Sequence, residues 1–159
     1  MRIDMYRLKS LFLAVVFCAL SFFQSYAGDI KSSNDLLNEI AGSTDKQVVL
    51  VNFYASWCPP CREEIKDLIK VREQFSSNDL RIIAVNLDEE ASIMQAFNKS
   101  AGINYETYHD FQGNISSFFN FQSIPFNIIY SKTGKAIYAK PGAIPLQRLI
   151  ELIEYGLTK

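Results

Sequence analysis

VVLVNFYASWCPPCREE, the stretch from Val48 to Glu64, decides the fold. Its first seven residues are mostly apolar and rich in valine, which is typical of a strand buried on both faces of a sheet. From Arg62 onward the apolar side chains follow helical spacing. Cys58 and Cys61 therefore lie where a buried strand gives way to a helix. Two thiols at this spacing can close a small disulfide ring and reopen it, so the pair predicts electron exchange with other cysteines.

Outside this stretch, strand and helix patterns alternate along the chain. Further strands are predicted at 81–87, 103–108, 126–130 and 136–140, and helices are predicted to end at Gly42, near Phe75 and near Ala101, to span 115–119 and to start around Pro145. The turn at 132–135 predicts an antiparallel hairpin, whereas the long helix after the first strand predicts a parallel pair. The expected fold is an α/β three-layer sandwich, with a central mixed sheet and helices on both faces.

The first 27 residues have the pattern of an export signal. A basic start is followed by an apolar run at 11–23 and by small residues at Ser25 and Ala27. The apolar run is shorter than the ~20 residues that a spanning helix needs. We therefore expect residues 1–27 to be a signal peptide and residues 28–159 to be one exported, periplasmic domain. Retention of the leader as an uncleaved membrane anchor remains open, and membrane contact is expected only in that case.

Charge and length narrow the class of protein further. The 132 residues after the leader carry 13 basic and 16 acidic side chains, which argues against nucleic acid as a partner. A chain of this length can build its own core without a second domain, and we expect a monomer.

The cysteine pair is suited to chemistry rather than to stability. Cys58 and Cys61 are the only cysteines after the leader, and closing so small a loop removes little chain entropy. At a helix N-terminus Cys58 is the candidate nucleophile, at an exposed tip, and Cys61 one turn later is the candidate resolving thiol. Pro59 fits the first helical position, and Pro60 stiffens the ring. The expected redox disulfide is Cys58–Cys61.

Neither a metal nor a cofactor is expected. Two thiolates and the single histidine, His109, do not complete a tetrahedral set of ligands. His109 itself is interpreted as a surface or turn residue. Trp57 can shield the thiolate and contact a protein substrate, or it can simply pack on the helix. The phenylalanines near Pro125 are interpreted as core residues: Phe118, Phe119, Phe121 and Phe126.

Glu64 and the Ile124-Pro125 pair are the remaining candidate site residues. Glu64 follows Cys61 by three positions, so its carboxylate shares a helix face with that sulfur and can relay a proton, or it can merely complement the helix end. Pro125 lacks a backbone donor and fits the start of a strand at a bend. If that bend faces the cysteines, the backbone of Ile124 can pair with a substrate strand.

Taken together, these motifs resemble the thioredoxin superfamily, and within it the exported TlpA/ResA-like thiol:disulfide oxidoreductases. The resemblance covers roughly 48–157, includes the central insertion at 89–109, and is most specific at Trp57-Cys58-Pro59-Pro60-Cys61. It implies that Cys58 attacks, Cys61 resolves, Pro125 is cis and faces the disulfide, and Glu64 tunes the pair. Asn52 departs from plain thioredoxins, which carry a buried acid there, and the helix before Gly42 departs from the hairpin usual in this branch.

The resemblance also implies a physiological setting. Family members of this kind reduce protein disulfides in an oxidising compartment, take electrons from a membrane-bound donor, maintain cell redox homeostasis and often serve cytochrome c maturation. The chain lacks the G-V-x-G-x-P-E pattern of a dedicated cytochrome-maturation protein near Pro125. A net disulfide oxidase and a non-enzymatic binding or chaperone module with the same fold remain alternatives.

Overall fold

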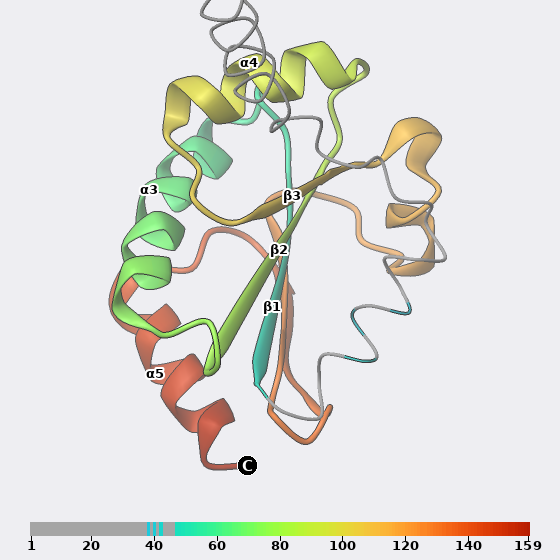
Figure 1. The fold of residues 1–159 in the computed structure, drawn as a ribbon. Helices are drawn as coiled ribbons and strands as arrows, with labels where there is room; N and C mark the ends of the chain where they lie inside the picture. The colour runs from blue at the N-terminus through green and yellow to red at the C-terminus, as the bar shows by residue number, and fades with distance from the viewer. Residues whose placement is uncertain (1–37, 39, 41, 43–46) are drawn as a thin grey trace, which may run out of the picture.

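Strands and helices alternate along the part of the chain that the computed structural model describes, residues 38, 40, 42 and 47–159 (Figure 1). The elements are β1 (Val48–Tyr54), α3 (Pro59–Gln74), β2 (Leu80–Asn86), α4 (Ala91–Ala101), β3 (Glu106–His109), the 3₁₀ turns Phe111–Gly113 and Ser116–Phe118, β4 (Phe126–Tyr130), β5 (Ala136–Pro141) and α5 (Leu146–Leu157). The leader at 1–27, and with it the predicted domain boundary, lies outside the described residues. Gly42, predicted to end the first helix, is itself helical.

The five strands form one mixed sheet in the order β3-β2-β1-β4-β5. β1 pairs in parallel with β2, and β2 pairs in parallel with β3. β4 runs antiparallel to β1, and β5 runs antiparallel to β4. The predicted parallel pair, the predicted hairpin and the α/β three-layer class are therefore confirmed. β1 occupies the centre of the sheet, which is why all seven of its residues are buried.

The side chains of β1 alternate between two separate cores. On one face they meet α3 and α5 in a cluster that includes Val48, Leu50, Leu68, Val71, Leu149 and Ile153. On the other face they meet the 3₁₀ segment and the first helix in a cluster that includes Ile40, Val49, Val51, Phe53 and Ile115. Figure 1 shows α3 and α5 side by side on one face, with α4 at the end of the sheet where β1 finishes. This packing holds the end of β1, and the cysteines after it, on a fixed support.

Several predicted details are wrong, for local reasons. β3 begins at Glu106 rather than at Ile103, because Ile103 and Tyr105 pack under α3 before strand pairing starts. The short helix predicted at 115–119 is a 3₁₀ turn, preceded by a second one. The predicted core residue Phe118 is 65% exposed, although the other three phenylalanines contact the core.

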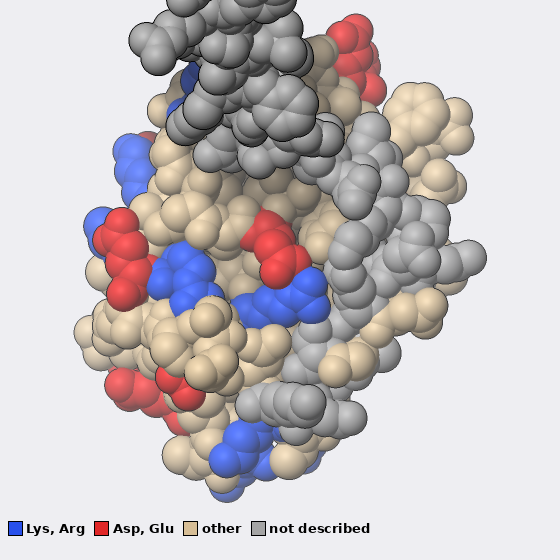
Figure 2. Space-filling model, viewed as in Figure 1, with Lys and Arg blue, Asp and Glu red and all other residues tan. Residues whose placement is uncertain are grey.

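The described surface carries charges of both signs. On the face drawn in Figure 2, Lys and Arg side chains lie beside Asp and Glu side chains in small mixed groups, and uncharged surface lies between these groups. In the described part of the chain, no helix combines the length and the apolar character needed to cross a membrane.

Candidate redox site

The site begins where β1 ends and α3 starts. Cys58 is the N-cap of α3, and Pro59 and Pro60 are its first helical residues, as predicted. Cys58 and Cys61 form a disulfide, with their Cα atoms 5.3 Å apart. The backbone amide of Cys61 points at the Cys58 sulfur from 3.3 Å. A free amide and the positive end of a helix favour a negatively charged sulfur, so this geometry stabilises a Cys58 thiolate after reduction.

The prediction that Cys58 lies at an exposed tip is wrong for the disulfide form. Cys58 is 3% exposed and Cys61 is 1% exposed. Both pack in the small core below the loop, beside Tyr54 and Ile65, because the N-cap turns the sulfur inward toward the helix. The exposed residue at the tip is Trp57, which is 64% exposed. Most of the Trp57 side chain is therefore open to solvent rather than packed on the helix.

The bend before β4 faces the disulfide. The Ile124-Pro125 peptide bond is cis, which confirms what the resemblance implied for Pro125. The Ile124 carbonyl oxygen lies 3.8 Å from the Cys58 sulfur. Residues more than 60 positions apart in the chain therefore lie side by side, with the Ile124 backbone next to the Cys58 sulfur.

Glu64 is buried beneath this surface, on the side of α3 that faces the sheet. One carboxylate oxygen accepts hydrogen bonds from the Asn127 side chain at 2.8 Å and from the Ile144 amide at 2.7 Å. The other accepts one from the Asn52 side chain at 2.9 Å. Burial raises the pKa of Glu64 from 4.5 to about 7, and the three hydrogen bonds oppose that rise. A carboxyl group with such a pKa can both take and give a proton near neutral pH.

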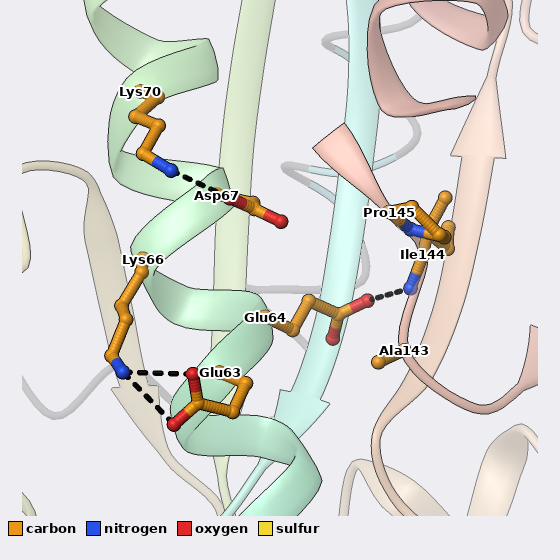
Figure 3. Close-up of a pocket in the computed structure, with 8 residues that line it drawn as sticks. All are labelled: Glu63, Glu64, Lys66, Asp67, Lys70, Ala143, Ile144 and Pro145. Atoms are coloured by element: carbon orange, nitrogen blue, oxygen red, sulfur yellow. Dashed lines mark hydrogen bonds and ion pairs between the residues drawn. The ribbon is translucent and has the colours of Figure 1, made fainter. Parts of the chain in front are cut away.

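Glu64 also lines a groove at the surface of α3. The groove has a volume of about 270 Å³ and runs between α3 and the segment 143–145. Figure 3 shows Glu64 extending across it toward Ile144, whereas Glu63 turns aside to pair with Lys66 at 2.8 Å. Glu63 and Glu64 thus point to different surroundings, as the helical spacing predicted.

Two asparagines complete the site, and the sequence analysis did not assign a role to either. Asn52 of β1 and Asn127 of β4 are directly opposite each other in the sheet, and the Asn52 side-chain nitrogen donates to the Asn127 side-chain oxygen, Oδ1, at 2.8 Å. Both are buried. Each is the one amide residue in an otherwise apolar or aromatic strand, and the cysteines lie near the end of β1 and the start of β4. That pattern is the signal that could have identified them.

A second polar network supports the loop before Cys58. The Asp88 carboxylate accepts hydrogen bonds from the Ser56 amide at 3.0 Å and from the Ser56 hydroxyl at 2.9 Å. Asn86 donates to the same carboxylate at 2.8 Å. His109, predicted to lie at the surface, is instead 8% exposed, with its Nε2 2.7 Å from the Asp88 carbonyl. The interpretation as a surface residue is wrong because His109, at the end of β3, pairs with Asn86 at the end of β2, so its ring lies under the loop that follows β2.

The sequence matches that of known families and proteins along most of its length. The model of the AhpC/TSA family matches residues 27–139. The thiol-disulfide oxidoreductase ResA of Bacillus subtilis (strain 168) is 25% identical over 164 residues, which cover 92% of each chain. The sporulation thiol-disulfide oxidoreductase A of the same organism is 22% identical over 111 residues, which cover 68% of this chain and 67% of that relative.

Solved structures agree on the fold. A thiol:disulfide interchange protein of the thioredoxin family from Chlorobium tepidum TLS has a TM-score of 0.67 at 23% identity, over 74% of this chain and 84% of that chain. StoA from Bacillus subtilis has a TM-score of 0.61 at 22% identity, over 68% and 83%. At these identities the likeness concerns the fold alone, and it confirms a thioredoxin-like α/β sandwich.

Proposed function

Because the chain belongs to the AhpC/TSA family and carries a cysteine pair at a helix N-terminus, we propose that it is an exported thiol:disulfide oxidoreductase that reduces disulfides in other proteins. The observation that carries this proposal is the Cys58–Cys61 disulfide, with the Cys61 amide directed at the Cys58 sulfur. That arrangement supplies a stabilised thiolate and a second thiol within reach, which are the two groups that dithiol exchange requires.

The reaction consumes the reduced form of the protein. The Cys58 thiolate attacks one sulfur of a substrate disulfide, so that a mixed disulfide forms and the second substrate sulfur leaves as a thiolate and takes up a proton. Cys61 then loses its proton and attacks the Cys58 sulfur. The substrate departs as a dithiol, the Cys58–Cys61 disulfide is restored, and two electrons have passed to the substrate.

Substrate binding is assigned to the surface around the sulfur. Trp57 is exposed beside it and offers aromatic contact area, and the Ile124 carbonyl oxygen offers a backbone acceptor to an extended substrate segment. Pro59, Pro60 and Pro125 shape this surface and donate no backbone hydrogen bond that would compete for the substrate.

Glu64 is assigned as the proton acceptor for Cys61. Its hydrogen bonds go to Asn52, Asn127 and Ile144 and not to the sulfur, so the transfer requires a bridging water molecule between the carboxylate and Cys61. Its pKa of about 7 suits that task, because the ionised form is available to take the proton at neutral pH.

The cellular setting follows from the leader pattern and from the relatives. We assign the chain to the periplasm as a monomer, with residues 1–27 removed or kept as an anchor, and with electrons supplied by a membrane-bound donor. The relative ResA is named a thiol-disulfide oxidoreductase, which supports the exchange chemistry. We propose an oxidising compartment and a role in cytochrome c maturation because the sequence motifs resemble those of the exported TlpA/ResA-like proteins. Mass measurement of the exported protein checks the leader: a chain that starts at Gly28 is expected.

Reduction of insulin by the purified protein in the presence of a dithiol tests the activity. We expect the wild-type protein to accelerate reduction, Cys58→Ser to abolish the effect, and Cys61→Ser to accumulate mixed disulfides. Activity that survives in Cys58→Ser would refute the proposal. The Cys61→Ser variant, expressed in the native cell, identifies the protein substrates directly.

Equilibration with glutathione separates a reductant from an oxidase. We expect a reduction potential well below about −180 mV, the value of protein disulfide isomerase, which is one of the more oxidising thiol:disulfide exchange proteins. A value at or above that level would reverse the assigned direction of electron flow while leaving the exchange chemistry in place.

A further inference from the structure

We propose that Asn127 is a positioning residue, which holds the Glu64 carboxylate and the segment 142–144 in one arrangement and so sets how readily Glu64 takes the proton of Cys61. The proposal rests on the role given to Glu64 in the proposed function. It assigns to Asn127 no contact with the substrate or with either sulfur.

The geometry places Asn127 at the centre of the buried network. Its side-chain amide donates to Glu64 at 2.8 Å and to the Gly142 carbonyl oxygen at 3.3 Å, and its side-chain oxygen accepts from Asn52 at 2.8 Å. Every polar atom of the side chain is therefore used, and each partner lies on a different part of the fold. A buried amide with all its partners in place has one orientation available, so it fixes the carboxylate as well.

The same side chain joins Glu64 to the loop that carries Pro125. The Gly142 amide donates to the Pro125 carbonyl oxygen at 2.8 Å, and the Ile144 amide donates to Glu64 at 2.7 Å. Asn127 thus braces a segment that contacts the substrate-binding bend at one end and the proton acceptor at the other. Loss of its side chain would leave the buried Glu64 carboxylate short of a donor and would remove the contact that ties Gly142 to β4.

The charged surroundings of Glu64 indicate the direction of the effect. Burial is the main cause of the raised pKa of Glu64, and Asp67 on the same helix adds to it. Burial also raises the pKa of the Tyr105 hydroxyl, and the charges of Tyr54 and Glu64 add to that rise. Three further charged groups line the groove: Glu63, Lys66 and Lys70. The two lysines are engaged by Glu63 and Asp67, so neither pairs with Glu64. Donation from Asn127 is therefore one of the few interactions that favour the ionised carboxylate, and its loss disfavours that form.

Titration of Glu64 in the disulfide form tests the proposal, because the cysteines do not titrate in that state. Infrared or carbon NMR spectra of protein with labelled glutamate report the carboxyl group directly. Asn127→Leu removes the donor, and Asn127→Asp keeps the size but places a second acid beside Glu64. We expect both to raise the titration midpoint, by about one pH unit for the leucine variant. Ile129→Val on the same strand is the matched control for packing and should leave the midpoint unchanged.

Exchange rates give the functional readout. At pH 7 a rise of one unit lowers the ionised fraction of Glu64 about fivefold, so Asn127→Leu should slow the step limited by Cys61 by a similar factor. In a Glu64→Gln background the same substitution should have no further effect on the pH profile.

Three results would overturn the proposal: an unchanged midpoint in both Asn127 variants, a loss of rate that persists in the Glu64→Gln background, or a Glu64→Gln protein as fast as wild type. Failure of the proposed function looks different, since the wild-type protein itself would then not exchange disulfides.

Discussion

At the scale of single residues, two opposing effects decide the state of Glu64. Removal from water disfavours its charged form, and three hydrogen bonds favour it. Burial prevails, because the pKa still rises to about 7. Among the described residues, the Asn52 side-chain oxygen is buried without a hydrogen-bond partner. The nitrogen of the same side chain donates to both Glu64 and Asn127, so this orientation of the amide favours the ionised carboxylate.

The raised pKa of Glu64 predicts how stability depends on pH. Below pH 4.5 the group is protonated in both folded and unfolded chains, and above about pH 7 it is ionised in both. Between these values the folded protein keeps a proton that the unfolded chain releases. Glu64 should therefore reduce the stability of the wild-type protein progressively as pH rises through this window, by about 3 kcal/mol in all.

Urea unfolding of the oxidised protein across this pH range measures the effect, with Glu64→Gln as the comparison. Other groups titrate equally in both proteins, so the difference between their two curves isolates Glu64. We expect the free energy of unfolding of the glutamine variant to increase relative to that of the wild-type protein as pH rises. Parallel curves would mean that Glu64 has an ordinary pKa despite its burial.

At the scale of elements, the loop from Ala55 to Trp57 depends on the neighbouring strand. Asp88 lies just after β2, and its carboxylate accepts hydrogen bonds from both the amide and the hydroxyl of Ser56. The residues at the end of β2 therefore order the loop that follows the parallel strand β1. This places Asp88 in support of Cys58 without contact to the sulfur. We expect Asp88→Ala to lower the free energy of unfolding by about 1–3 kcal/mol, because the Ser56 amide and the Asn86 side chain lose their acceptor.

The same variant should also slow disulfide exchange, because a looser loop holds Cys58 less well at the helix N-terminus. Ser56→Ala is the graded control, since it removes the hydroxyl and keeps the amide contact. Denaturation curves and insulin reduction measure the two effects. Equal rates in Asp88→Ala and wild type would show that the loop is ordered by packing alone.

The contact between α5 and β1 leads to a prediction that opposes helix propensity. A methyl group added at Gly156 would lie 2.9 Å from Val48 Cγ2 and 3.2 Å from Ile137 Cδ1. Val48 is fully buried and β-branched, so it cannot turn aside easily. Gly156→Ala should therefore destabilise the protein by about 1–3 kcal/mol, even though alanine favours a helix by about 1 kcal/mol. Thermal unfolding checks this; a higher midpoint than wild type would contradict it.

At the scale of the whole molecule, the sequence predicts those parts of the fold that local pattern determines. β1 and β4 have the predicted bounds because apolar runs flanked by turn residues leave few alternatives. His109 and Asn127 were not foreseen as parts of the site, since their roles depend on which strands become neighbours. The burial of Cys58 escaped prediction for a related reason, because its cover comes partly from the distant Ile124. Long-range pairing, which local pattern does not encode, completes the site.

The opposite face of the sheet yields a prediction about the limits of the folding unit. Ile40 is 6% exposed and packs in the core cluster with Val49, Val51 and Ile115. A chain that starts at Gly28 keeps this contact, and every described residue of the redox site, so it should match the full chain in stability and in disulfide exchange. A chain that starts at Gln47 loses Ile40 and should be less stable by at least about 2 kcal/mol.

Ile40→Ala in the full chain separates the contribution of this one side chain from that of the segment around it, and it should account for about 2 kcal/mol or more. Exchange by the shorter chain, measured where it is still folded, should remain near that of the full chain, because no described site residue precedes Asn52. If the chain that starts at Gln47 unfolds at the same urea concentration as the chain that starts at Gly28, the packing of Ile40 on Val49 and Val51 does not stabilise the fold.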